Sequence, residues 1–281
     1  MTGTSPRVWV NGELVDPTAP SIAALDHAVT VGDGVFETAK IDRGQPFALS
    51  RHHARLERSA AGLGLPAVDL ALVGKGIDAV LGGEPIDFGR LRYSVTGGIG
   101  PLGSDRAVGD LTYIVVAAPQ ARPPASGKVT VVPWTRNERS AVAGLKTTSY
   151  AENVVALARA KEAGAMEAVF GNTRGELCEC TGSNIFVVVG GEVLTPPEDS
   201  GLLAGITREL VLEWAAAAGL PIREEALPLE VLDTADEVFI TSSTKDVLPV
   251  HAVDDRSLPV GPVTTRLRNL FRSRAGQDLD P

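Results

Sequence analysis

One lysine stands where its side chain could bond covalently to a carbonyl compound. Lys146 lies in Gly144-Leu-Lys-Thr-Thr-Ser-Tyr150, a stretch with few charges just before a predicted helix. Apolar and hydroxyl neighbours can lower the pKa of a lysine, and a neutral amine attacks aldehydes and ketones to form a Schiff base. The pattern therefore indicates a Schiff-base lysine, and the alternative is an ordinary solvent-exposed loop lysine.

A lone carboxylate occupies an otherwise uncharged predicted strand. Glu179 stands between Cys178 and Cys180, immediately before Thr181-Gly-Ser-Asn184. A buried carboxylate needs a partner, which can be a cation or a protonated ring nitrogen. Because side chains alternate along a strand, Glu179 can equally lie on the solvent face, and the pattern leaves both positions open.

Two segments carry hydrogen-bond donors of the kind that bind phosphate. Leu203-Ala-Gly-Ile-Thr-Arg208 enters a predicted helix after a glycine, which leaves the amides of Ile206 and Thr207 without helical partners. Thr241-Ser-Ser-Thr244 leaves a strand with four successive hydroxyls, although serine and threonine also serve as ordinary caps and turn residues. An aldehyde to capture, a ring nitrogen to pair and a phosphate to bind together describe pyridoxal 5′-phosphate (PLP).

The segment Gly98-Ile-Gly-Pro-Leu-Gly103 matches the dinucleotide-binding pattern GxGxxG by letter only. That pattern functions where a strand ends and a helix begins, so that the helix N-terminus meets the pyrophosphate. Here Ser104 to Asp110 is rich in turn residues, and the next predicted element is a strand. The segment is therefore predicted to be a glycine-rich hairpin loop.

The first part of the chain is predicted to combine short strands with two helices. Asn11-Gly12 favours a hairpin turn between strands at Arg7 to Val10 and Glu13 to Val15. A second turn, Asp42 to Gln45, separates strands at Val35 to Ile41 and Pro46 to Leu49. Apolar residues at helical spacing, followed by glycines, predict helices at Ser50 to Ala61 and Asp69 to Leu81. Strands are predicted at Arg90 to Thr96 and Leu111 to Ala118.

A proline-rich stretch, Pro119 to Gly127, predicts a linker between two domains, residues 1–120 and 128–281, joined by residues 121–127. In the second domain, a helix at Tyr150 to Ala163 places Val154, Leu157, Ala158 and Lys161 on one side. A second helix is predicted at about Ile206 to Ala218, and the arginines of a closing helix are expected to form a solvated face. Short strands joined mostly by hairpins favour an α+β fold over a doubly wound parallel sheet.

Composition excludes several classes of protein. The chain has 281 residues, of which 44% are hydrophobic and 22% charged, the balance of a folded globular protein. Its apolar runs are far short of the roughly 18 residues that cross a bilayer, and Met1 to Pro6 lacks signal-peptide features, so we expect a cytoplasmic protein without a membrane partner. A net charge of −9 disfavours nucleic acid. Two cysteines one residue apart and four histidines without ligand spacing predict buried thiols and no metal site.

These motifs together resemble the class IV aminotransferases, the fold-type IV PLP enzymes that include branched-chain, D-amino-acid and (R)-amine transaminases and aminodeoxychorismate lyase. The resemblance covers nearly the whole chain. Its motifs are Asp26, Gly32-Asp-Gly-Val-Phe-Glu-Thr38, His52-His-Ala-Arg-Leu56, Lys146 to Tyr150, Glu179-Cys-Thr-Gly-Ser-Asn-Ile-Phe186, Leu194-Thr-Pro-Pro197, Gly205-Ile-Thr-Arg208 and Asp236-Glu-Val-Phe-Ile-Thr-Ser-Ser243. It implies a smaller N-terminal α/β sandwich with the substrate pocket and a larger C-terminal pseudo-barrel that binds PLP.

The resemblance also implies roles for the matching residues. Lys146 would form the internal aldimine and carry the proton between the substrate Cα and C4′ of the cofactor. Glu179 would pair with the pyridine nitrogen, because a protonated ring is the electron sink of the reaction. Arg55 would bind the phosphate. The other implied cofactor-binding residues are Tyr150, at the phenolic oxygen, and Ser183, Asn184, Gly205, Ile206, Thr207, Ser242 and Ser243, the last in place of the family's usual threonine.

The predicted substrate pocket consists of Phe36, Thr38, Lys40, Arg92, Leu102 and Thr244. Thr38 and Lys40 resemble the lyase and the D-specific members, whereas Arg92 stands where branched-chain enzymes have a pocket arginine. Leu102 occupies the position of the carboxylate-binding arginine of the lyase and the D-amino-acid enzyme. Losing such a bidentate partner would cost about 2–3 kcal/mol of binding, which counts against both activities.

The sequence leaves the reaction open. Arg90 or Arg106 could replace the missing charge, and the backbone at Thr244 could hold an α-carboxylate, as in branched-chain enzymes. The first hypothesis is a PLP-dependent aminotransferase that moves an amino group between an amino acid or amine donor and a keto acid. The alternatives are an aminodeoxychorismate lyase, which releases 4-aminobenzoate and pyruvate, and a binding protein without catalysis. The resemblance further implies a homodimer in amino acid metabolism.

Overall fold

A computed structural model of the protein describes residues 5–106 and 109–281. The chain forms two compact units. Unit 1 consists of Met1–Arg122, Leu145–Ser149 and Leu279–Pro281, and unit 2 of Pro123–Gly144 and Tyr150–Asp278. Residues 1–4 of the segment without signal-peptide features, and residues 107–108 of the turn-rich stretch, lie outside the described residues.

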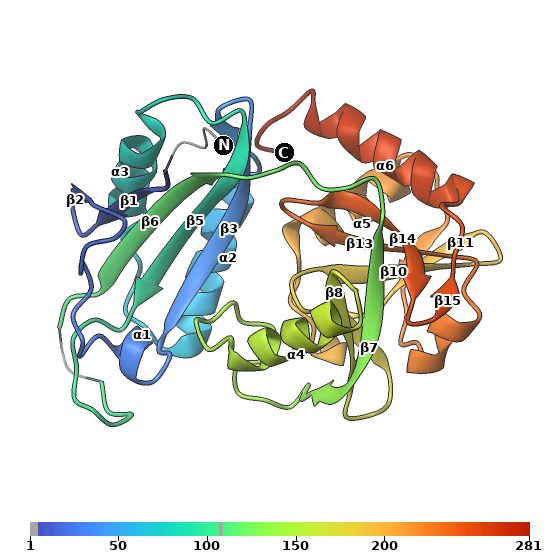
Figure 1. The fold of residues 1–281 in the computed structure, drawn as a ribbon, viewed down its shortest axis with the longest axis horizontal. Helices are drawn as coiled ribbons and strands as arrows, with labels where there is room; N and C mark the ends of the chain where they lie inside the picture. Colours follow the sequence, from blue (N-terminus) through green and yellow to red (C-terminus); the bar gives the residue numbers. More distant parts are fainter. Residues whose placement is uncertain (1–4, 107–108) are drawn as a thin grey trace. The chain divides into compact units, whose positions relative to one another are not determined.

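Unit 1 is built on an antiparallel sheet, which has six strands in its described residues, in the order β2-β1-β6-β5-β3-β4. β1 (Arg7–Val10) and β2 (Glu13–Val15) form the predicted hairpin, and both turn residues have positive φ, 46° at Asn11 and 112° at Gly12. This left-handed conformation is what a two-residue hairpin turn requires. The other strands are β3 (Gly34–Asp42), β4 (Gln45–Pro46), β5 (Phe88–Thr96) and β6 (Thr112–Pro119) (Figure 1).

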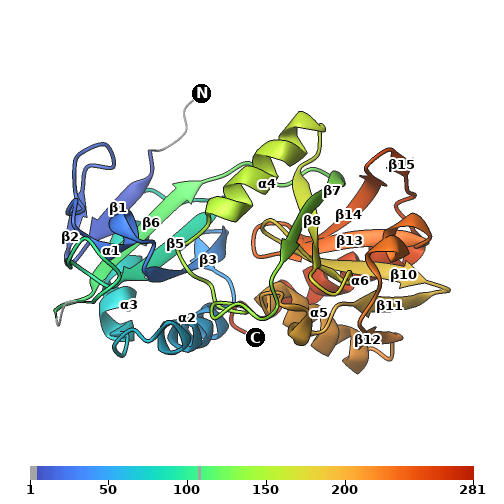
Figure 2. The same cartoon turned by 90° about the horizontal axis from the view of Figure 1, so that it is seen from below.

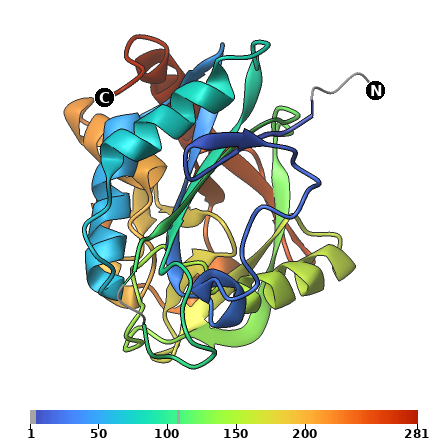
Figure 3. The same cartoon turned by 90° about the vertical axis from the view of Figure 1, so that its left-hand side faces the viewer.

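The helices α2 (Leu49–Leu63) and α3 (Leu70–Leu81) cover one face of this sheet (Figures 2 and 3). Leu56 and Ala60 of α2 pack in one core with Val35 and Ala39, which share a face of β3. A short helix, α1 (His27–Thr30), precedes β3. The predicted strand Pro46 to Leu49 is wrong beyond Pro46, because Ala48 takes a left-handed conformation (φ 55°) and turns the chain into α2.

The GxGxxG segment is a loop between β5 and β6, as predicted. Gly98 has a φ of 73°, and a Cβ on it would lie 2.1 Å from the carbonyl oxygen of Asp110. The glycine is therefore needed for a close approach of two backbones within the loop.

Unit 2 is built on a mixed sheet whose described strands follow the order β12-β11-β10-β13-β14-β7-β8-β9, with β15 paired to β14. Cys180 N–H donates to the carbonyl of Ser183 (2.8 Å), so the end strand β9 turns back beside β10 and the sheet curls (Figure 2). The strands are β7 (Gly127–Arg136), β8 (Glu167–Asn172), β9 (Leu177–Cys180), β10 (Asn184–Val189), β11 (Glu192–Thr195), β12 (Ile222–Glu224), β13 (Glu237–Ser242), β14 (Asp246–Val253) and β15 (Arg256–Ser257).

The helices of unit 2 are α4 (Ala151–Glu162), α5 (Ile206–Ala217) and α6 (Pro262–Ala275), with short 3-10 helices at η1 (Glu198–Ser200) and η2 (Leu229–Asp233). The side of α4 that carries Val154, Leu157, Ala158 and Lys161 is not the face that the helix buries. The helix buries Ala156 and Ala160 against Phe170 of β8, while Val154 is 66% exposed. Small side chains allow the helix a close approach to the strands, which its apolar pattern did not indicate. The solvated face of α6 is confirmed, since Thr264, Leu267 and Phe271 are its buried residues.

Two negative findings apply to residues 5–106 and 109–281. No helix there is long and apolar enough to cross a membrane. No group of three or more histidine, cysteine, aspartate or glutamate side chains could hold a metal ion within the same ranges. Cys178 and Cys180 are free and buried, which confirms the prediction of buried thiols, and burial raises the pKa of both.

Two glycines of α3 provide a test of the packing in unit 1. A Cβ on Gly76 would lie 2.6 Å from Val115 Cγ2 and 2.8 Å from the Trp9 ring, whereas a Cβ on Gly74 would have nothing within 4 Å. We expect Gly76→Ala to destabilise the fold by about 1–3 kcal/mol through overpacking. Gly74→Ala, the matched control, should be neutral or stabilise by up to about 1 kcal/mol. Urea unfolding followed by circular dichroism measures both, and equal effects would contradict the packing.

Candidate active site

The backbone of Lys146 is fixed on both sides within unit 1. Its N–H donates to Ser59 Oγ of α2 (3.1 Å), and its carbonyl accepts the N–H of Phe36 in β3 (3.0 Å). Thr147 forms a β-bridge with Val35, and the N–H of Thr148 donates to the carbonyl of Gly34 (2.8 Å). The segment thus runs as a short extended piece beside the start of β3, which determines where the lysine side chain begins.

The side chain of Lys146 lies against an aromatic ring. Its Nζ is 4.6 Å from the centroid of the Phe36 ring, and the guanidinium of Arg92 stacks on the same ring with its Cζ 3.5 Å from the centroid. Thr38 pairs directly with Arg92 across β3 and β5, so that these side chains share a face of the sheet. The structure therefore brings together Lys146 and three of the predicted pocket residues.

Lys40 continues the same face of β3. It is 5% exposed, and its Nζ lies 4.9 Å from the centroid of the Phe47 ring. Arg90 pairs directly with it across the strands and is exposed. Leu102 is 76% exposed in the β5–β6 loop, so its place in a pocket stays a prediction.

Arg106 cannot readily replace the missing pocket arginine, because its donors are used elsewhere. Nε and Nη2 donate to Asp33 (2.7 and 2.6 Å), and Nη1 and Nη2 donate to the carbonyls of Gly64 and Leu63 (2.6 and 2.8 Å). These hydrogen bonds hold the pKa of Asp33 below its usual range. Arg106 thus fastens the loop after β5 to the end of α2.

A buried ion cluster joins β3 to α2 on the opposite face of the sheet. Glu37 is fully buried and accepts Arg55 Nε and Nη2, both at 2.7 Å, in a bidentate pair. His52 Nδ1 lies 2.6 Å from the same carboxylate. Burial alone would raise the pKa of Glu37, but Arg55 and His52 outweigh it and hold the pKa far below its usual range. Burial lowers the pKa of His52, so a neutral ring donates its Nδ1 hydrogen to Glu37.

Glu179 in unit 2 is held by a cation and an amide. Its side chain is 14% exposed, with Oε1 3.2 Å from Arg136 Nε, and Oε2 accepts the N–H of Leu203 (3.0 Å). Arg136 also donates to Asn153 Oδ1 (2.8 Å), and its guanidinium lies 4.1 Å from the centroid of the Phe170 ring. The pairing of Arg136 with Glu179 could not be predicted from the sequence, because the two residues are 43 positions apart and lie on different strands.

The start of α5 offers unpaired backbone donors. Its N-cap is Gly205, which provides no side-chain cap, so the amides of Ile206 and Thr207 lack the usual partner. Asn184 Nδ2 donates to the carbonyl of Leu203 (2.8 Å), and a Cβ on Gly205 would lie 2.0 Å from Asn184 Oδ1. The glycine is thus required by contact with Asn184, which holds the loop before the helix.

Two orphaned hydroxyls lie at the end of β13 in the same unit. Thr241 Oγ1 and Ser242 Oγ are buried without a hydrogen-bond partner. Thr241 pairs directly with Asn184 across β10 and β13, so it shares a sheet face with the residue that contacts Gly205. Thr241 and Ser242 are consecutive along β13, so their side chains point to opposite faces, and only Thr241 shares the face of Asn184. Buried polar atoms without partners are unfavourable, and the uncapped start of α5 offers backbone amides suited to a phosphate.

The predicted cofactor residues Ser183 and Tyr150 and the predicted pocket residue Thr244 lie in unit 2. Ser183 Oγ donates to Glu167 Oε1 (2.6 Å). Tyr150 is the N-cap residue of α4, and Thr244 is buried in the turn after β13. Their predicted roles toward a cofactor or substrate stay predictions.

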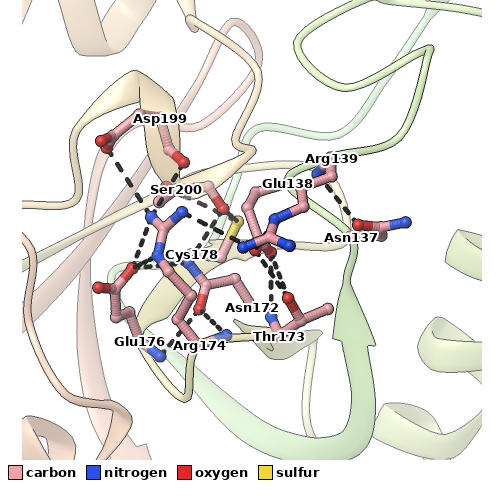
Figure 4. A network of polar contacts seen from close by, with 10 residues as sticks. All are labelled: Asn137, Glu138, Arg139, Asn172, Thr173, Arg174, Glu176, Cys178, Asp199 and Ser200. Carbon is pink, nitrogen blue, oxygen red and sulfur yellow. Dashed lines mark hydrogen bonds and ion pairs between the residues drawn. The ribbon is translucent and has the colours of Figure 1, made fainter.

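A polar network fastens two loops of unit 2 to the β8–β9 hairpin (Figure 4). Glu138, in the loop after β7, accepts the N–H and Oγ1 of Thr173 (3.1 and 2.7 Å). Arg174 donates to the carbonyl of Asp199 in η1 (3.0 Å), and Asn172 Nδ2 donates to the carbonyl of Ser200 (3.3 Å). The network thus fixes the loop after β7 and the η1 segment to the β8–β9 hairpin within unit 2.

The ion cluster of unit 1 is testable by removing one charge. We expect Glu37→Gln to destabilise the fold by about 3–5 kcal/mol, because Arg55 would remain buried without a counter-charge. Glu57→Gln, on the exposed side of α2, should change stability by no more than about 0.5 kcal/mol. Because the folded-state pKa of Glu37 is lowered, its contribution is fully present above the pKa of an unfolded glutamate and declines progressively as the pH falls below that value. Urea midpoints between pH 7 and 3 measure this difference, and similar midpoints for the two variants would refute it.

Comparison with known proteins identifies relatives along nearly the whole chain. The family model described as amino-transferase class IV matches residues 34–253. A putative branched-chain-amino-acid aminotransferase of Methanocaldococcus jannaschii is 34% identical, over 95% of this chain and 95% of its own. A D-alanine aminotransferase of Listeria innocua is 29% identical over 94% of both chains. An aminodeoxychorismate lyase of Bacillus subtilis is 28% identical, over 94% of this chain and 93% of its own.

A solved structure agrees with the fold. A hypothetical aminotransferase from Mycobacterium tuberculosis in its PLP-bound form has a TM-score of 0.83 to this chain at 28% identity, covering 95% of this chain and 98% of that one. The predicted family and fold class are confirmed.

Proposed function

The chain belongs to the class IV aminotransferase family and is a transaminase, and we propose that it binds PLP through Lys146 to move an amino group from an amino acid or amine to a keto acid. Enzymes of this family depend on PLP. The observation that carries the proposal is the fixed backbone of Lys146, whose Nζ lies against Phe36 beside Arg92.

The donor set of unit 2 fits the phosphate of PLP. The uncapped amides of Ile206 and Thr207 supply donors without a helical partner. Thr241 Oγ1 and Ser242 Oγ, on opposite faces of β13, each lack a hydrogen-bond partner, so either one can donate to a bound group on its own face. Because the chain has a net charge of −9, its overall charge does not favour anion binding, and a phosphate must be bound by local hydrogen-bond donors such as these. In unit 1, Arg55 is the proposed phosphate arginine, and its pair with Glu37 fixes the plane of the guanidinium.

The remaining roles follow from charge and position. When bound, PLP supplies an aldehyde for the lysine and an electron sink for the charge that develops at the substrate Cα. Lys146 Nζ would hold and return the proton of that carbon. Glu179, oriented by Leu203 and Arg136, would accept the hydrogen of the ring nitrogen. Tyr150 would donate to the phenolic oxygen.

The pocket face of β3 and β5 is cationic. Lys40 and Arg92 lie on it with Thr38 between them, which suits a substrate carboxylate. Thr38 and Lys40 also keep the lyase reaction as an alternative, and one relative is named for that activity. We further propose that the substrates are small molecules, that the chain works in the cytoplasm and that it has no nucleic acid partner.

A donor panel tests the reaction. With PLP bound, a suitable amino donor should shift the cofactor absorbance to that of the pyridoxamine form, and a keto acid should restore it. Lys146→Ala should lose nearly all turnover. Lys161→Ala, at an exposed lysine of α4, is the control and should retain it.

Two outcomes would change the assignment. Release of 4-aminobenzoate from aminodeoxychorismate would replace the transaminase with the lyase. An absorbance that no L-, D- or (R)-amine donor shifts would contradict the proposed reaction.

We also propose a homodimer, in which apolar surface of unit 1 is covered. Leu25, Val29 and Val31 around α1 are 46, 63 and 41% exposed, and Ile99 of the β5–β6 loop, which bridges to Asp26, is 61% exposed. Contiguous apolar surface of this kind often marks an interface. Sedimentation should give twice the chain mass of 29.3 kDa, and a fully active monomer would contradict the proposal.

A further inference from the structure

Glu167 is a buried carboxylate at the start of β8 that the proposed reaction does not use. It is 2% exposed, and four donors surround it. Oε1 accepts Lys245 Nζ (2.5 Å) and Ser183 Oγ (2.6 Å). Oε2 accepts Thr181 Oγ1 (2.8 Å) and the N–H of Gly182 (2.7 Å). All five residues belong to unit 2, so the cluster is internal to one compact part of the chain.

The partners of Glu167 come from two connections of the sheet. Thr181 to Ser183 joins β9, which carries Glu179, to β10, which begins at Asn184. Lys245 ends the turn between β13 and β14, and its N–H donates to the carbonyl of Ser242 (3.2 Å). A single carboxylate therefore fixes the turn that bears Ser242, Ser243 and Thr244 to the connection that follows Glu179.

The turn itself needs such a hold. Asp246, the residue directly after Lys245, has a φ of 53°, a left-handed conformation that aspartate adopts more readily than most residues but less readily than glycine. Such a backbone persists only where surrounding contacts determine it. The Lys245 side chain is only 21% exposed, and its ion pair with Glu167 ties this end of the turn to β8.

The electrostatics of the cluster favour a fixed charge pair. Burial by itself would raise the pKa of Glu167, but the charge of Lys245 and the hydrogen bonds from Lys245, Ser183 and Gly182 hold it below its usual range. The carboxylate is therefore ionised at neutral pH, and the pair is lost only on acidification. A buried ion pair is stable only when hydrogen bonds satisfy its remaining polar atoms. The β9–β10 connection and the β13–β14 turn, which supply these donors, are therefore held in fixed positions relative to each other.

We propose that Glu167 and Lys245 are positioning residues for the phosphate of the cofactor, which hold the Ser242–Thr244 turn in the conformation that donates to it. The inference rests on the proposed function, because it assumes that this turn binds PLP. Neither side chain touches the phosphate in this account. Their effect passes through the turn backbone and through the hydroxyls of Ser242 and Ser243.

The test separates the phosphate from the rest of the cofactor. The dissociation constants of PLP and of pyridoxal, which lacks the phosphate, are measured by absorbance titration on the full-length protein. In Lys245→Met, the preference for PLP over pyridoxal should fall about ten-fold or more, equivalent to ~1.4 kcal/mol, while pyridoxal affinity stays within about two-fold. Lys245→Arg keeps the charge and should retain most of the preference.

A matched control removes another buried carboxylate of unit 2. Glu237 is 5% exposed and accepts the N–H groups of Val263 and Thr264 at the start of α6. Glu237→Gln should lower stability as Glu167→Gln does, yet leave the preference for PLP unchanged. Glu167→Gln should reduce that preference as Lys245→Met does.

The outcomes distinguish the two proposals. An unchanged preference in Lys245→Met, or an equal fall in Glu237→Gln, would overturn the positioning role. Failure of the unsubstituted protein to bind PLP would instead refute the proposed function. If Glu167→Gln does not fold, the pair of Lys245 variants still decides the inference, since Lys245 is partly exposed.

Discussion

A carboxylate is stable in the interior of a protein only where donors surround it, and this constraint organises the polar interior of both units. Glu37 in unit 1 takes a bidentate arginine and a histidine, and Glu167 in unit 2 takes a lysine, two hydroxyls and an amide. In each case the donors come from segments that are distant in sequence. Each carboxylate therefore fixes the relative positions of segments within its own unit, and part of the proposed cofactor site, namely Arg55, Ser183 and the Ser242–Thr244 turn, lies on those segments.

The alternation of β3 explains how one strand serves both faces of its sheet. The side chain of Glu37 points to α2, and that of its neighbour Phe36 points to the opposite face of the sheet. Lys146 Nζ and the Arg92 guanidinium both contact the Phe36 ring. On α2, Arg55 and Ser59 stand four residues apart and thus on the same side of the helix. One helix therefore orients the proposed phosphate arginine and, through Ser59, the backbone of the lysine.

The sequence was informative where the signals are local, and less so where contacts are long-range. The Asn11-Gly12 hairpin and the helix from Ser50 follow from neighbouring residues, and the structure has both. Arg136 and Lys245 could not be assigned, because their acidic partners lie on other strands, 78 positions away for Lys245. The buried face of α4 did not follow from its apolar pattern, because Ala156 and Ala160, which carry a weak apolar signal, form that face. Arg106 looked available for a substrate, and only the fold revealed that Asp33 and two carbonyls use its donors.

We propose Lys146 as the residue to which the cofactor is attached. The most direct test of this attachment is borohydride reduction of the PLP-loaded protein, followed by peptide mass mapping. We expect one phosphopyridoxyl group per chain, on the peptide that contains Lys146, and none in Lys146→Ala. A modification on another lysine, or none in the unsubstituted protein, would contradict it.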